Sequence, residues 1–134
     1  MRRFIQIIVV VCALVLVTGC AHVRKDRQAK QLEAATSSYR QALRWGYVDA
    51  ALSYLHPDVA TPDALEHLAR IRITSYDEVR PAMWINETTA TQVARIEYVI
   101  LDQQRVDSLL DQQEWRFDPE QGGWLLHSPL PRFE

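Results

Sequence analysis

Four histidines are the side chains best suited to bind a metal ion or to exchange protons near neutral pH. They are His22, His56, His67 and His127. No pair of them has the spacing of zinc ligands on a helix, and the only two cysteines, Cys12 and Cys20, lie near the N-terminus. The sequence also has no glycine-rich phosphate loop and no nucleophile elbow. We therefore expect no metal site, no cofactor and no nucleophilic triad.

Acid–base chemistry is the other reaction type that the residues allow. It requires a carboxylate whose pKa is raised in an apolar pocket, and a hydroxyl group or protonated acid that donates to an oxyanion. Tyr39, together with Asp63 or Asp77, is a candidate for these roles. The fold must bring these side chains into one pocket for such chemistry to occur.

Cys20 ends an N-terminal segment with the layout of an export signal. Met1-Arg2-Arg3 carries two basic side chains, and Phe4 to Val17 is apolar except for Gln6. A basic start followed by about 7–15 apolar residues is typical of a secretory signal peptide, whereas a membrane span needs roughly 20. The segment ends in Leu16-Val17-Thr18-Gly19-Cys20, which resembles the lipobox of bacterial lipoproteins.

This resemblance implies cleavage between Gly19 and Cys20 and a diacylglycerol on the Cys20 thiol. Two or more acyl chains hold a protein stably on a membrane, at roughly 0.8 kcal/mol per buried methylene. Ala21 follows the cysteine, and in Gram-negative lipoproteins the absence of Asp at this position favours the outer membrane. We expect a lipid-anchored protein that faces the periplasm. The alternatives are an ordinary signal peptide with a chance cysteine and an uncleaved short anchor.

The remaining chain is long enough for one domain. We expect residues 1–19 to be the signal peptide, residues 20–30 a lipidated tether, and residues 31–134 the folded domain. The mature chain has 13 basic and 17 acidic residues, a net charge of −4, which argues against nucleic acid as a partner. Both cysteines lie outside the domain, so it has no disulfide available.

A basic cluster follows Cys20 in the tether. It is either a solvated segment or a contact with anionic lipid headgroups, which contributes on the order of 1 kcal/mol per charge. The cluster consists of Arg24, Lys25, Arg27 and Lys30.

Helices are expected in the first half of the domain. Apolar residues recur at steps of three and four from about Gln28 to Trp45, which predicts a helix with one buried stripe. The stripe consists of Leu32, Ala35, Tyr39, Ala42 and Leu43. Gly46 interrupts the pattern, and a second short helix is expected from Val48 to Leu55. A third should start with Thr61 as its N-cap and Pro62 as its first helical residue.

After Arg70 the period changes to two, which predicts antiparallel strands. The expected strand segments are Ile71/Ile73, Val93 to Leu101, Val106 to Phe117 and Trp124 to His127. The turns between the later strands are expected at Asn86-Glu87-Thr88, Asp102-Gln103-Gln104 and Pro119 to Gly123. Trp115 and Trp124 should lie close to each other across the last hairpin. Helices followed by strands indicate an α+β fold.

Over roughly residues 28–131 this order resembles the nuclear transport factor 2-like (cystatin-like) superfamily. The motifs are the N-terminal helix, the closing Trp-turn-Gly-Trp hairpin, and the segment from Trp45-Gly46-Tyr47 to His56-Pro57-Asp58. The resemblance implies a cone, in which helices pack across a strongly curved antiparallel sheet of about four strands, often around an apolar pocket. Some members are isomerases or cyclases; others bind ligands, dimerise or act as accessory domains.

The isomerases of this superfamily also place an acid inside a late strand, facing the pocket. Here Asp118 and Glu120 fall at the last turn, and the acids that precede them in the chain lie beside or within the preceding turn. Those acids are Asp102, Asp107 and Asp111. This departure argues against an isomerase, so no catalytic residue is carried over from the family.

The aromatic residues either fill the core or line a pocket for a lipid or other apolar ligand. The side chains expected to line such a pocket are Tyr39, Leu43, Trp84, Tyr98 and Trp115. We predict a lipid-anchored, non-catalytic binding or accessory module whose partner is a small apolar ligand, an envelope protein or a second copy of the chain. An isomerase- or cyclase-like enzyme, or a structural subunit of an envelope assembly with a filled cone, is the alternative.

Overall fold

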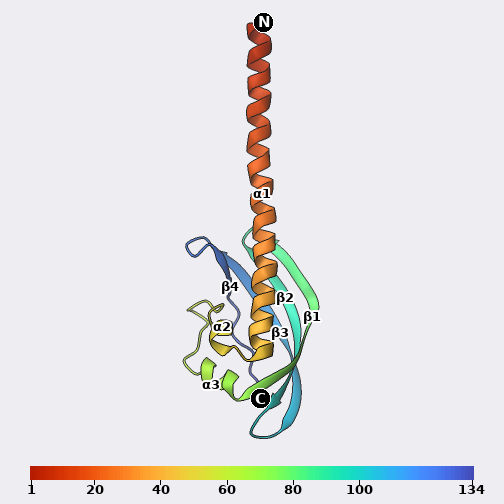
Figure 1. The fold of residues 1–134 in the computed structure, drawn as a ribbon, viewed down its shortest axis with the longest axis vertical. Helices are drawn as coiled ribbons and strands as arrows, with labels where there is room; N and C mark the ends of the chain where they lie inside the picture. The colour runs from red at the N-terminus through yellow and green to blue at the C-terminus, as the bar shows by residue number, and fades with distance from the viewer.

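A computed structural model describes residues 1–10 and 19–134 of the chain. The predicted signal peptide therefore lies partly outside the described residues, as do Cys12 and the lipobox residues Leu16, Val17 and Thr18. Figure 1 shows one long helix, α1 (Arg2–Trp45), whose C-terminal half lies across a curved sheet. Within the described ranges, no helix has the length and apolar character needed to cross a membrane.

Helix α1 starts at Arg2, well before the expected start near Gln28. The expected stripe is confirmed, because Leu32, Tyr39, Ala42 and Leu43 are buried against the sheet and Ala35 is partly buried. Residues 20–30 are also helical, and nearly all of their side chains are exposed. The predicted tether is thus an extension of the helix that packs on the sheet.

Gly46 ends α1 in the left-handed conformation, with a φ of 73°. The N–H of the next residue, Tyr47, donates to the carbonyl of Ala42 at 2.8 Å. This arrangement satisfies a terminal carbonyl of the helix and redirects the chain. Glycine takes this conformation at little cost because it has no Cβ.

Two short helices follow, α2 (Val48–Leu52) and α3 (Ala64–Ala69). The prediction that Thr61 caps the third helix is wrong, because Asp63 is its N-cap. The Ala64 N–H donates to the Thr61 carbonyl at 3.1 Å, which closes a turn through Pro62. The helix therefore starts two residues later than expected.

Four strands form one antiparallel sheet in the order β1-β2-β3-β4. They are β1 (Ile71–Asn86), β2 (Thr89–Ile100), β3 (Arg105–Asp118) and β4 (Gly123–Leu126). The three predicted turns connect them, so the predicted α+β class with a sheet of about four strands is confirmed.

Strand β1 is the main departure from the predicted strands, because only its first residues show an alternating pattern. It continues to Asn86, with register shifts between Ile73 and Ser75, Glu78 and Arg80, Arg80 and Met83, and Trp84 and Asn86. Such irregularities bend and twist a strand and disturb the alternation of its side chains. Pro81 is tolerated because β1 is an edge strand. The curve of the sheet in Figure 1 agrees with these irregularities.

Strand β2 has the two faces that its sequence predicts. Ala94, Ile96, Tyr98 and Ile100 are buried, whereas Arg95 and Glu97 are exposed. The buried face forms the core with α1 and with the inner face of β3.

The last hairpin does not pair its two tryptophans. Trp115 lies opposite Leu126, and Trp124 lies opposite Phe117. The two tryptophans are therefore diagonal neighbours across the hairpin, as their predicted proximity allows, and not direct partners. Trp124 instead reaches α1, where its indole N–H donates to the Gln28 carbonyl at 3.1 Å.

Candidate functional site

The inner face of the sheet carries a polar cluster that the sequence analysis did not find. Its centre is Asp111, which was expected to flank a turn and lies instead well inside β3, opposite Ala94 of β2. The predicted strand from Val106 to Phe117 already contained Asp111, so it was wrong to place this acid beside the turn; it lies in the middle of β3 (Arg105–Asp118). Asp111 is only 4% exposed, since it shares the inward face with Gln113 and Trp115.

Gln113 connects the members of this cluster. Its side-chain amide N–H donates to Asp111 Oδ2 at 2.6 Å and to the Tyr76 hydroxyl at 2.8 Å. Its carbonyl oxygen accepts from Gln92 Nε2 at 2.6 Å and from Trp115 Nε1 at 3.1 Å. One amide group thus orients four neighbours from three strands.

Burial controls the protonation of these groups. Desolvation raises the pKa of Asp111 to about 6, although the hydrogen bond from Gln113 opposes the shift. Desolvation also raises the pKa of Tyr76 and, together with the Asp111 charge, that of Tyr39. The Tyr39 hydroxyl is fully buried and has no hydrogen-bond partner among the described residues. A carboxyl group that titrates near neutral pH therefore shares the core with two protonated phenols.

Aromatic rings close off this cluster. Tyr39 and Trp115 make an edge-to-face contact at 5.5 Å between ring centroids, and Tyr54 contacts both rings at 6.2 and 6.1 Å. Tyr39 and Trp115 are fully buried. These two predicted pocket-lining residues thus pack against each other in the interior of the cone.

The other predicted lining residues lie apart from one another. Tyr98 packs edge-to-face on Phe133 at 5.0 Å, and its hydroxyl donates to the main-chain oxygen of Glu134 at 3.0 Å. Trp84 packs on Trp124 at 5.3 Å and lines a groove of about 460 Å³ between α1 and the β1–β2 hairpin. Leu43 lines a separate cavity at the C-terminal end of α1.

The basic cluster of the tether borders the groove that contains Trp84. Arg24 and Lys25 line this groove, and Lys25 Nζ lies 3.6 Å from the Glu87 carboxylate at the tip of the hairpin. Both side chains of this ion pair are well exposed, so its contribution to stability is small.

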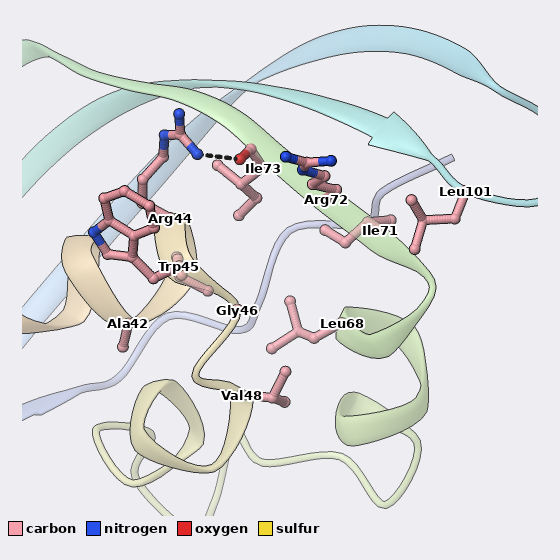
Figure 2. A pocket seen from close by; sticks show the side chains of 11 residues that line it. Ala42, Arg44, Trp45, Gly46, Val48, Leu68, Ile71, Arg72, Ile73 and Leu101 are labelled. Atoms are coloured by element: carbon pink, nitrogen blue, oxygen red, sulfur yellow. Dashed lines mark hydrogen bonds between the residues drawn. The ribbon is translucent and has the colours of Figure 1, made fainter.

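The region around Leu43 is a cavity of about 350 Å³ that is lined mostly by apolar residues (Figure 2). It lies where the end of α1, the start of β1 and helix α3 meet. The side chains of Val48, Leu68 and Ile71 point into it. Arg44 and Arg72 stand on its other side, and Arg44 donates to the Ile73 carbonyl at 3.0 Å. An apolar cavity with a few polar groups at its edge suits a small ligand.

The two acids considered for acid–base chemistry lack the buried, apolar surroundings that this chemistry requires. Asp63 is exposed, and a hydrogen bond from Thr61 lowers its pKa. Asp77 is exposed on β1, where it accepts a hydrogen bond from Ser75 Oγ at 2.9 Å. Neither acid is buried with the Tyr39 hydroxyl, whereas the charge of Asp111 is near enough to raise the pKa of Tyr39. Asp111 is four residues before Trp115, so in a strand both side chains point to the same face. This alternation would have identified Asp111 as an inward-facing acid.

Two of the histidines meet at the edge of β4. The His56 and His127 rings stack at 4.2 Å, and desolvation, together with His56 and Arg116, lowers the pKa of His127. In the part of the chain that the structure describes, no three potential ligands gather into a metal site.

Comparison with known proteins identifies the fold. No family model matches the chain, and no curated protein matches it significantly. A candidate calcium/calmodulin-dependent kinase II association domain from Exiguobacterium sibiricum 255-15 is 17% identical, with a TM-score of 0.57 over 78% of this chain and 95% of that one. A ketosteroid isomerase-like protein from Erwinia carotovora atroseptica SCRI1043 is 14% identical, with a TM-score of 0.55 over 72% and 88%.

A third structure is described directly as a nuclear transport factor 2-like protein with a cystatin-like fold. It comes from Novosphingobium aromaticivorans and is 14% identical, with a TM-score of 0.52 over 83% of this chain and 84% of that one. This chain has the nuclear transport factor 2-like fold. Isomerase-like and association-domain proteins share that fold, so its function depends on the side chains that it carries.

Proposed function

We propose that this protein is a lipid-anchored module of the cell envelope whose nuclear transport factor 2-like domain binds a small apolar ligand without catalysing a reaction. The observation that carries the proposal is the apolar cavity at the end of α1 (Figure 2). Its volume of about 350 Å³ falls within the usual range of small-molecule sites. The cone interior, in contrast, is filled by Tyr39, Tyr54 and Trp115.

The anchor part of the proposal rests on the N-terminal sequence. Cys20 is exposed on α1. Apart from the exposed Lys25–Glu87 ion pair, the hydrogen bonds of this helix to the sheet reach back to Gln28. About eight residues, or roughly 12 Å of helix, therefore separate the thiol from the packed domain. This distance leaves the cysteine accessible to a lipid-transferring enzyme.

Mass spectrometry of the protein extracted from bacterial membranes tests the anchor. We expect a mature chain that starts at Cys20 and carries two or three acyl chains. Cys20→Ser should abolish the modification, whereas Cys12→Ser is the matched control and should leave it intact. An unmodified chain that retains residues 1–19 would contradict the anchor.

Native mass spectrometry of the full lipoprotein released from detergent tests ligand binding. We expect a bound small molecule that is lost when Val48→Phe fills the cavity. Val99→Phe makes the same change on the outer face of β2 and should leave the ligand bound. A chain that is always free of ligand but co-purifies with an envelope protein would favour the structural-subunit alternative.

An acid–base enzyme is a second candidate because of the Asp111 cluster. It contains a carboxyl with a pKa of about 6 and the Tyr39 hydroxyl, which has no hydrogen-bond partner among the described residues; these are the two groups that such chemistry requires. Neither Asp111 nor Tyr39 lines the cavity at the end of α1, the groove beside Trp84 or three further surface cavities of the described residues. Solvent hydrogen–deuterium exchange next to the carbonyl of a cyclic ketone, lost in Asp111→Asn, would favour the enzyme.

A further inference from the structure

The charges around the apolar cavity differ from those of the domain as a whole. Residues 31–134 contain nine basic and 16 acidic side chains, a net charge of −7. The cavity is nevertheless lined by two arginines, Arg44 and Arg72, and by no carboxylate. Local charge at this site is therefore opposite in sign to that of the protein that surrounds it.

Both arginines are available for a ligand. Neither has an ion-pair partner among the described residues, whereas the neighbouring Arg70 lies 3.4 Å from Asp102. Arg44 is held in place, because one guanidinium nitrogen donates to the Ile73 carbonyl at 3.0 Å and the group lies 5.5 Å from the centre of the Trp45 ring. A guanidinium has five N–H donors in a fixed plane, so this hydrogen bond leaves others for an anion.

The arginines and the apolar side chains occupy different parts of the cavity. In Figure 2 the two guanidinium groups flank the Ile73 carbonyl, while Val48 and Leu68 point in from the opposite side. Leu101 at the edge is partly exposed, so the site is open to solvent. This arrangement matches a molecule with an anionic head and an apolar tail.

We propose that the cavity binds an anionic amphiphile, with its carboxylate between Arg44 and Arg72 and its alkyl tail against Val48, Leu68 and Ile71. This proposal deepens the proposed ligand-binding function and rests on it. A carboxylate paired with arginine forms charge-assisted hydrogen bonds that an alcohol of the same length cannot form. An ammonium head on the same tail would be repelled.

Three probes with eight-carbon chains test the proposal on the full-length protein in zwitterionic nanodiscs: octanoate, octanol and octyltrimethylammonium. The emission of Trp45, which lines the cavity, reports binding, and Trp45→Phe identifies its share of the signal. We expect octanoate to bind at least about tenfold more tightly than octanol, and the cationic probe to bind weakest.

Variants test the contacts of the ligand's anionic head and of its alkyl tail separately. Arg44→Gln and Arg72→Gln should each weaken octanoate binding several-fold and leave octanol unchanged, whereas the control Arg70→Gln should change neither. Val48→Phe should abolish binding of both probes. Equal binding of octanoate and octanol, both lost in Val48→Phe, would overturn the anionic-ligand proposal and leave the apolar site standing. Binding of neither probe would overturn both.

Discussion

The amide nitrogen of Gln113 lies 2.6 Å from Oδ2 of Asp111, and both side chains are almost fully buried in the core. This hydrogen bond stabilises the charged form of the carboxyl, but burial outweighs it and the pKa of Asp111 rises to about 6. A negative charge in this position therefore lowers the stability of the folded state at neutral pH.

Asp111→Asn should stabilise the protein at alkaline pH. The ordinary pKa of 3.8 in the unfolded chain rises to about 6 on folding, so the folded state binds the proton more tightly. The wild type should gain stability as the pH falls from about 6 to 4. At pH 8 the variant should be more stable by about 2–3 kcal/mol, since each pKa unit corresponds to about 1.4 kcal/mol.

Urea unfolding of both proteins at pH 8 and pH 4 measures this difference. Other titrating groups, including His127, are common to the two proteins and cancel in the comparison. A variant that is less stable than the wild type at pH 8 would show that the charged carboxylate stabilises the fold.

Tyr39→Phe should raise the free energy of unfolding by about 1 kcal/mol, because it removes a buried hydroxyl that has no partner among the described residues. Tyr98→Phe is the matched control. Its hydroxyl donates to the main-chain oxygen of Glu134 at 3.0 Å, so its loss should lower stability by about 1 kcal/mol. Thermal or urea unfolding measures the stability of both variants. Stability changes of the same sign would contradict the explanation that only the Tyr98 hydroxyl has a hydrogen-bond partner.

Gly46→Ala should destabilise the protein by about 1–2 kcal/mol, because alanine is strained at the φ of 73° that ends α1. The space around Gly46 is open, with no atom within 4 Å of an added Cβ, so a loss of stability would come from the backbone alone. Gly123 also has open space but no positive φ, so Gly123→Ala should cost less. Equal losses in urea unfolding would argue against the backbone explanation.

Regular elements were predictable because burial of one face imposes a period on their residues. The stripe from Leu32 to Leu43 and the alternation in β2 are examples, and together they gave the correct fold class. Strand β1 was not predictable beyond Ile73, because four register shifts and Pro81 remove the alternation. The lipobox lies partly outside the described residues, so the anchor stays a prediction.

The candidate site was predictable only in part. Tyr39 was identified as a polar group on the buried helix face, but its partner acid was sought at Asp63 and Asp77, which are exposed. Asp111 was overlooked because it was grouped with the acids around the preceding turn, although it lay inside the predicted strand and on the same face as Trp115. The cavity with Arg44 and Arg72 combines the end of α1 with the end of α3 and the start of β1, more than 20 residues further along the chain, and no local pattern marks such a meeting.

The contact between Trp124 and Gln28 has a consequence for how the protein is made. The two residues are 96 positions apart, so α1 is synthesised first and its buried stripe is covered fully only when the last strand arrives. At about 5–20 residues per second, most of the synthesis time passes before that strand exists. The buried face of α1 therefore stays incompletely covered until late in translation, whatever the earlier strands have already formed.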